Sequence, residues 1–128
     1  MDRLIIVAAV VVVAALAAFL IFGGAGQRPT TTVQASNAVT ITLTEYALNP
    51  NHIVINHGRV KLTIVNAGKV IHEFILHDPV TNQDIGTVAF LKPGATQDLW
   101  VDLVAYRRYD MYDSTYRYKG MQGALTAR

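Results

Sequence analysis

The chain of 128 residues contains no cysteine. This absence excludes disulfides, thiolate metal ligands and a cysteine nucleophile, and it leaves the redox compartment of the protein undetermined. Charged residues are also scarce, at 16% of the chain, and 11 basic against 9 acidic side chains give a formal net charge of +2. Because both signs are scattered along the sequence, the chain has no basic patch of the kind that binds nucleic acid. We therefore expect no nucleic-acid partner.

The residue patterns of common enzymes are absent as well. The serines are Ser36, which falls in a tether-like segment, and Ser114, which has no histidine near it in the sequence. The segment GGAG, residues 23–26, lacks the lysine and the preceding strand that a phosphate-binding loop requires. We therefore predict no catalytic residue and no enzymatic activity.

One long hydrophobic run is present, LIIVAAVVVVAALAAFLIF, from Leu4 to Phe22. As a helix rising about 1.5 Å per residue it would be roughly 28 Å long, close to the thickness of a bilayer core. It predicts a membrane anchor over residues 1–22, with Arg3 and the amino terminus in the cytoplasm and the rest periplasmic or extracellular. A cleaved signal peptide is the alternative, because a short charged segment precedes the run and small residues follow it.

The remaining residues divide into a linker and one domain. Residues 23–37, GGAGQRPTTTVQASN, are rich in Gly, Thr, Ser and Pro and predict a flexible linker. Over residues 38–128, short runs of alternating apolar and polar residues are separated by Gly, Pro and Asn, which is typical of an all-β sandwich or barrel. The predicted strands are 39–44, 52–55, 59–66, 70–76, 86–91 and 97–103.

Three blocks of this domain resemble a known family in their order and spacing. The first, YALNPNHIVINHGRVKLTIVNAGKVIHEFIL, has a proline before a strand, a Gly-x-Val turn and an Asn-x-Gly loop that leads to His-x-Phe. The others are LKPGATQDLWVDL, with a Pro-Gly turn, and YDMYDSTYRYKGMQGALTA, which is similar to a C-terminal metal loop. The chain thus resembles the cupredoxins, the small copper-binding β-sandwiches that include plastocyanin and pseudoazurin. The resemblance implies a Greek-key cupredoxin-like sandwich preceded by a single transmembrane helix.

The resemblance also implies where a metal would bind. In the family, one copper ligand is the histidine of His-x-Phe, here His72, and the others follow the pattern Cys-x-x-His-x-x-x-x-Met, which falls on Asp113, Tyr116 and Met121. Blue copper needs a thiolate and two imidazoles, and the methionine is only a weak axial ligand. We therefore expect a degenerate site without copper or another cofactor. His72 would be a satisfied histidine at the rim, Met121 would fill space, and Tyr116 would cover the vacated position.

The same positions allow an alternative function in metal binding. His72, Asp113 and Tyr116 would supply one nitrogen and two oxygens, which suit ferric iron, zinc or a weakly bound cupric ion, with Met121 beside them. The phenol would have to lose a proton from a pKa of about 10, which only a strongly acidic metal ion favours. The protein would then be a membrane-tethered metal binder that handles copper or iron.

The carboxyl-terminal part is rich in tyrosine and arginine, which are enriched at the energetic centres of protein interfaces. The candidates for partner contacts are Tyr106, Arg107, Arg108, Tyr109, Tyr112, Arg117 and Tyr118. Equally, alternate tyrosines could line the core and its rim while the basic residues are solvated. In cupredoxins, redox partners dock around the metal loop, so the resemblance implies a retained interface.

These features together suggest an accessory subunit of a membrane electron-transfer complex, such as a respiratory oxidase or a photosynthetic reaction centre. Ala14 and Ala18 have the small-xxx-small spacing that lets a second helix approach closely in lipid. The expected partners are therefore membrane lipid and the other subunits of that complex.

Overall fold

The computed structural model describes residues 30–128. The predicted membrane anchor, residues 1–22, and residues 23–29 of the predicted linker lie outside the described residues. Within residues 30–128, no helical segment has the length and hydrophobicity needed to cross a bilayer.

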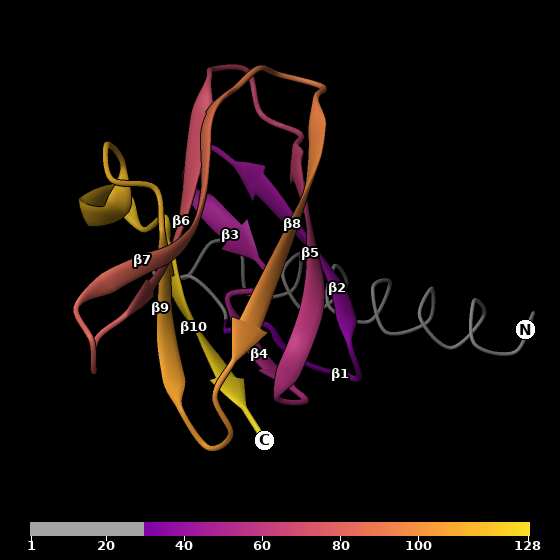
Figure 1. The fold of residues 1–128 in the computed structure, drawn as a ribbon. Helices are drawn as coiled ribbons and strands as arrows, with labels where there is room; N and C mark the ends of the chain where they lie inside the picture. Colours follow the sequence, from indigo (N-terminus) through magenta and orange to yellow (C-terminus); the bar gives the residue numbers. More distant parts are fainter. Residues whose placement is uncertain (1–29) are drawn as a thin grey trace, which may run out of the picture. The chain divides into compact units, whose positions relative to one another are not determined.

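The described residues form two β-sheets, one of six strands and one of four (Figure 1). In spatial order, the six-stranded sheet contains β1 (Thr32–Ala35), β4 (His52–Ile55), β10 (Gln122–Ala127), β9 (Arg108–Tyr112), β6 (His72–Asp78) and β7 (Gln83–Leu91). The four-stranded sheet contains β3 (Ala47–Asn49), β2 (Ala38–Thr44), β5 (Gly58–Asn66) and β8 (Thr96–Leu103). The predicted all-β sandwich is confirmed.

Alternation of apolar and polar residues builds the core between the sheets. In β2, Ile41 and Leu43 are completely buried, whereas the threonine between them is partly exposed. In the neighbouring strand β5, Ile64 pairs with Ile41 and is also completely buried. Burying one such side chain contributes about 1.5–3 kcal/mol relative to leaving it exposed. The alternation therefore decides which face of each strand turns inward.

Strand β1 differs from the sequence prediction, because it lies inside residues 23–37, the predicted flexible linker. It pairs in parallel with β4, with Thr32 opposite His52 and Ala35 opposite Ile55. Its residues alternate between exposed and half-buried, since this edge strand covers little of the core. Its apolar pattern is correspondingly weak. The compact unit thus begins at Thr32 and not near residue 38.

Strands β9 and β10 flank the loop that resembles a metal loop, and neither was among the predicted strands. The two strands are antiparallel, with Tyr112 opposite Gln122. The loop between them contains the short 3₁₀ helix η1 (Arg117–Lys119), which ends at Gly120. Gly120 has a φ of 114°, a left-handed conformation that favours glycine. Because β6 pairs with β9, the loop lies next to the beginning of β6.

Candidate functional site

The four positions that resemble copper ligands lie together at one end of the sandwich. His72 begins β6, Asp113 directly follows β9, and Met121 directly precedes β10. The exposed fractions of His72, Asp113 and Met121 are 1%, 1% and 0%. Tyr116 is half-buried, and its ring meets the His72 ring nearly at a right angle, with centroids 5.5 Å apart. The predicted positions therefore converge, but His72 is buried and does not lie at an exposed rim.

The Asp113 carboxylate is held by four hydrogen-bond donors of the chain. Its Oδ1 accepts hydrogen bonds from the backbone N–H groups of Thr115 and Tyr116, at 2.9 and 3.3 Å. Its Oδ2 accepts one from the backbone N–H of Glu73, at 3.0 Å, and lies 3.2 Å from Nδ1 of His72. A carboxylate has about four acceptor positions, so this carboxylate is saturated.

His72 is held between Asp113 and a second carboxylate, Glu45. Its Nε2 lies 3.0 Å from Oε1 of Glu45, whose side chain is 25% exposed. Carboxylate oxygens only accept hydrogen bonds, so the ring donates to both partners when each of its nitrogens carries a proton. We call Glu45, His72 and Asp113 the carboxylate–histidine cluster.

Glu45 was not predicted from the sequence. It lies in the turn between β2 and β3, and its carboxylate accepts hydrogen bonds from the backbone N–H groups of Lys69, at 2.7 Å, and Val70, at 3.0 Å. The pKa of Glu45 is lowered mainly by the hydrogen bond from Lys69, against the opposing effect of burial. Any side chain at Gly68 would collide with this carboxylate, so the glycine of the Asn-x-Gly loop leaves room for Glu45.

The chain matches a known protein family over most of its length. A model of the cupredoxin-like domain matches residues 6–127 of the chain. The chain belongs to the cupredoxin family. No significant match was found among curated proteins.

Solved structures of cupredoxins share the fold at low sequence identity. Auracyanin B is 16% identical, with a TM-score of 0.63 over 80% of this chain and 92% of its own. Auracyanin A from Chloroflexus aurantiacus is 14% identical, with a TM-score of 0.61 over 73% of this chain and 99% of its own. An azurin from Methylomonas sp. strain J is 12% identical, with a TM-score of 0.61 over 72% of this chain and 98% of its own.

This cupredoxin does not have the ligands of a blue-copper centre. The positions of the family's cysteine and second histidine are taken by Asp113 and Tyr116, and the chain has no cysteine to supply a thiolate elsewhere. A carboxylate, a phenol, one imidazole and a thioether do not form the soft trigonal set that blue copper requires.

The geometry of this cupredoxin also disfavours a harder metal ion. Among residues 30–128, no group of three or more His, Asp or Glu side chains is arranged to hold a metal. Glu45 and Asp113 face opposite nitrogens of the His72 ring, and the Asp113 oxygens already have their donors. The donor set that was predicted as an alternative therefore does not fit a metal in this arrangement.

The predicted contact residues do not form one surface. Tyr106, which is 89% exposed, lies in the turn between β8 and β9. Tyr118, which is 81% exposed, lies in η1 at the other end of β9 (Figure 1). At about 3.3 Å per residue, β9 separates the two positions by roughly 16 Å. The single aromatic and basic face expected from the sequence is therefore two separate regions.

Two of the predicted contact residues have partners within the domain. Tyr109 is 1% exposed, and its hydroxyl accepts a hydrogen bond from the backbone N–H of Val104, at 2.8 Å. The prediction for Tyr109 is therefore wrong, because it is a core residue. Arg107 donates a hydrogen bond from Nη1 to Oδ2 of the buried Asp78, at 2.8 Å. Burial acts to raise the pKa of Asp78, but hydrogen bonds from Val80 and Arg107 outweigh it and leave this pKa lowered.

Two exposed apolar side chains lead into the carboxylate–histidine cluster. Val70 and Ile71, which immediately precede His72, are 38% and 50% exposed. At the same end of the sandwich, the Lys119 ammonium lies 4.8 Å from the centroid of the Tyr46 ring, and this ring contacts Tyr116. We define the site-end surface as Val70, Ile71, Tyr118 and Lys119. The sequence signal for it was the apolar pair Val70-Ile71, which breaks the strand alternation before His72.

Proposed function

We propose that this cupredoxin is a membrane-anchored, extracytoplasmic accessory subunit of a respiratory or photosynthetic electron-transfer complex, without a blue-copper centre of its own. The proposal rests on the carboxylate–histidine cluster. Hydrogen bonds to Asp113 and His72 hold the loop between β9 and β10 in place, whereas in cupredoxins copper binds at this position. A loop that keeps its shape without the metal retains a defined surface for a partner.

The site-end surface supports a role in protein contact. Ile71 and Tyr118 expose large apolar areas at the position where redox partners dock in the family, and Lys119 adds a positive charge at the edge. Apolar and aromatic side chains with a charged rim are typical of protein interfaces. Nearby, His72 and Asp113 are buried and hydrogen-bonded, which gives this surface a rigid base.

The choice of complex rests on the family and on the predicted anchor. The fold is related to electron-transfer blue-copper proteins, and auracyanin A is described as a blue copper protein from a photosynthetic bacterium. The hydrophobic run before residue 23 would keep the domain at a membrane, where such complexes reside.

The test is the native mass of the full-length protein after extraction of its own membranes with a mild non-ionic detergent. We expect the protein to migrate in a large assembly that contains haem or photosynthetic pigment. Replacing Ile71 and Tyr118 with serine should release it, because the central apolar contacts of an interface dominate its affinity.

Trp100 provides the matched control for this experiment. It is 54% exposed on the other sheet, so Trp100→Ser removes a comparable apolar group away from the site-end surface. This variant should remain in the assembly. A wild-type protein that migrates alone in its micelle would rule out the subunit role.

A further inference from the structure

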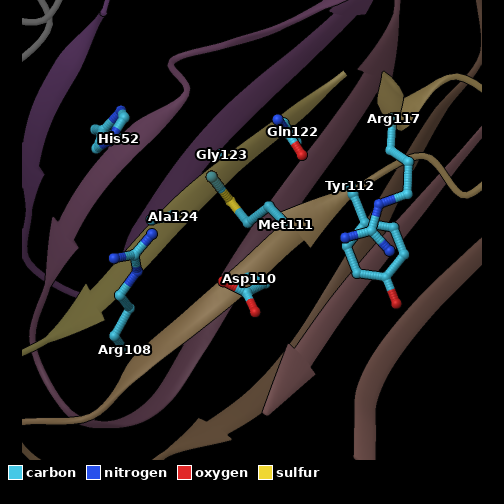
Figure 2. A pocket seen from close by; sticks show the side chains of 9 residues that line it. All are labelled: His52, Arg108, Asp110, Met111, Tyr112, Arg117, Gln122, Gly123 and Ala124. Atoms are coloured by element: carbon cyan, nitrogen blue, oxygen red, sulfur yellow. The ribbon is translucent and has the colours of Figure 1, made fainter. Parts of the chain in front are cut away.

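A groove with a volume of about 390 Å³ lies on the outer face of the six-stranded sheet, over β4, β10 and β9 (Figure 2). Its lining residues are His52, Arg108, Asp110, Met111, Tyr112, Arg117, Gln122, Gly123 and Ala124. Three of the predicted contact residues, Arg108, Tyr112 and Arg117, therefore meet here. Ala124 pairs with His52 on one side and with Asp110 on the other, and its small side chain forms the floor in the middle of the groove.

Charge alternates along this groove. Arg108, Asp110 and Tyr112 are alternate residues of β9 and so point to the same face of the sheet. The Arg117 guanidinium lies over the Tyr112 ring, 4.1 Å from its centroid, so a second positive charge stands at the Tyr112 end. The order along β9 is thus positive, negative, positive, at intervals of about 6.6 Å for each pair of residues.

None of these three charged side chains is paired with an opposite charge among residues 30–128. Within the described part of the chain, the ion pairs are those of Arg59, His72, His77 and Arg107, and none involves Arg108, Asp110 or Arg117. Arg108 and Arg117 are exposed, and Asp110 is half-buried. An arginine guanidinium forms bidentate hydrogen bonds with a carboxylate, which is stronger and more specific than a lysine contact.

We propose that this groove binds an extended segment of a partner protein in which two acidic residues flank a basic one, each two positions apart. The carboxylates would bind Arg108 and Arg117, and the central cation would bind Asp110. This inference rests on the proposed function, since the segment would belong to a neighbouring subunit, but it concerns a different surface from the site-end surface.

The test uses the full-length protein, labelled with ¹⁵N in neutral detergent micelles, and two synthetic pentapeptides of equal composition. The first is acetyl-Glu-Ser-Lys-Ser-Glu-amide, and the second is the permuted acetyl-Glu-Glu-Lys-Ser-Ser-amide. The first peptide should shift the amide signals of β9, of the beginning of β10 and of His52, and should bind more tightly than the second. The double variant R108Q/R117Q should weaken its binding about tenfold, as expected for loss of two exposed ion pairs.

Arg59→Gln is the matched control, because Arg59 is an exposed arginine whose ion pair with Asp102 lies on the other sheet. It should leave binding of the first peptide unchanged. Equal binding of the two peptides, or equal weakening by Arg59→Gln and R108Q/R117Q, would show non-specific attraction and overturn the proposal. Signal shifts outside the groove would also overturn it.

The native-mass experiment separates this inference from the proposed function. If R108Q/R117Q remains in the assembly while I71S/Y118S leaves it, the groove is not the contact, although the subunit role stands. If the wild-type protein migrates alone, the subunit role fails whatever the peptides do. The peptide titration then still decides whether the groove binds a segment with alternating charges in preference to the permuted one.

Discussion

At the scale of single residues, Asp113 is the side chain on which the loop between β9 and β10 depends most. Its removal by Asp113→Ala leaves the backbone N–H groups of Glu73, Thr115 and Tyr116, and Nδ1 of the buried His72, without their acceptor. Leaving buried hydrogen-bonding groups without their partner in this way costs about 1–3 kcal/mol. We expect the free energy of unfolding, measured by urea denaturation, to fall by about this amount.

The control for Asp113→Ala is Asp102→Ala. The Asp102 side chain is 76% exposed and pairs only with exposed Arg59, at 3.7 Å. Its loss should change the free energy of unfolding by about 0.5 kcal/mol or less. Similar effects for the two substitutions would mean that the hydrogen bonds to Asp113 contribute little to stability.

The double variant D113C/Y116H restores the family's ligand pattern and tests whether the loop still has the shape of a copper site. With His72 and Met121 in place, the variant would offer one thiolate, two imidazoles and an axial thioether. It should bind cupric ion and gain an intense visible absorption band from the thiolate–copper bond. The wild-type protein and the single variant Tyr116→His should stay colourless. A colourless double variant would show that the loop has lost the geometry of the site.

The sequence located only part of the carboxylate–histidine cluster. The positions of Asp113, Tyr116 and Met121 were recognisable through the resemblance of their spacing to the metal loop of the cupredoxins. Glu45 was missed because it reaches His72 across 27 positions of the chain, through the pairing of β2 with β5. Contacts of that range depend on strand order, which local periodicity does not contain.

At the scale of elements, Asp78 joins the end of β6 to the turn between β8 and β9, and its titration predicts acid sensitivity. Its pKa in the folded protein lies below the ordinary value of 3.8. As the pH falls, the unfolded chain therefore binds a proton at a higher pH than the folded protein does. The contribution of ionised Asp78 to the free energy of unfolding is complete above about pH 4, and it is lost as the pH falls through the folded pKa.

The substitution Asp78→Asn tests this titration. It should lower the urea midpoint at neutral pH, because the charged contact with Arg107 is lost. It should also make the midpoint fall less steeply below pH 4 than in the wild-type protein. Some decline should remain, since the pKa of Glu45 is lowered too. Parallel pH profiles of variant and wild type would contradict the role of Asp78.

The strands were predictable where one face is buried and the other is not. The prediction of 52–55 agrees with β4, and 59–66 and 97–103 agree with β5 and β8 to within one residue. Short or edge strands were missed because β1 and β3 contain few buried side chains. In β9, Tyr109 was mistaken for a contact residue because tyrosine suits both a core and an interface.

At the scale of the whole molecule, the hydrophobic run of residues 4–22 predicts that the protein stays with membranes during alkaline carbonate extraction. The full-length chain should remain in the membrane pellet, because a helix that spans the bilayer is not removed by disrupting peripheral contacts. A variant that begins at residue 30 behind a cleavable secretion signal should appear in the supernatant. If expression of the full-length sequence instead yields a released protein whose mass is reduced by that of the amino-terminal segment, the signal-peptide alternative is supported.

The saturated carboxylate of Asp113 has a consequence for how the protein is made in the cell. Copper proteins depend on delivery of their metal for maturation, whereas here the chain itself supplies every partner that the loop needs. Synthesis and folding of this domain should therefore be independent of copper nutrition. In cells grown with a copper chelator, immunoblots should show an unchanged amount of the protein.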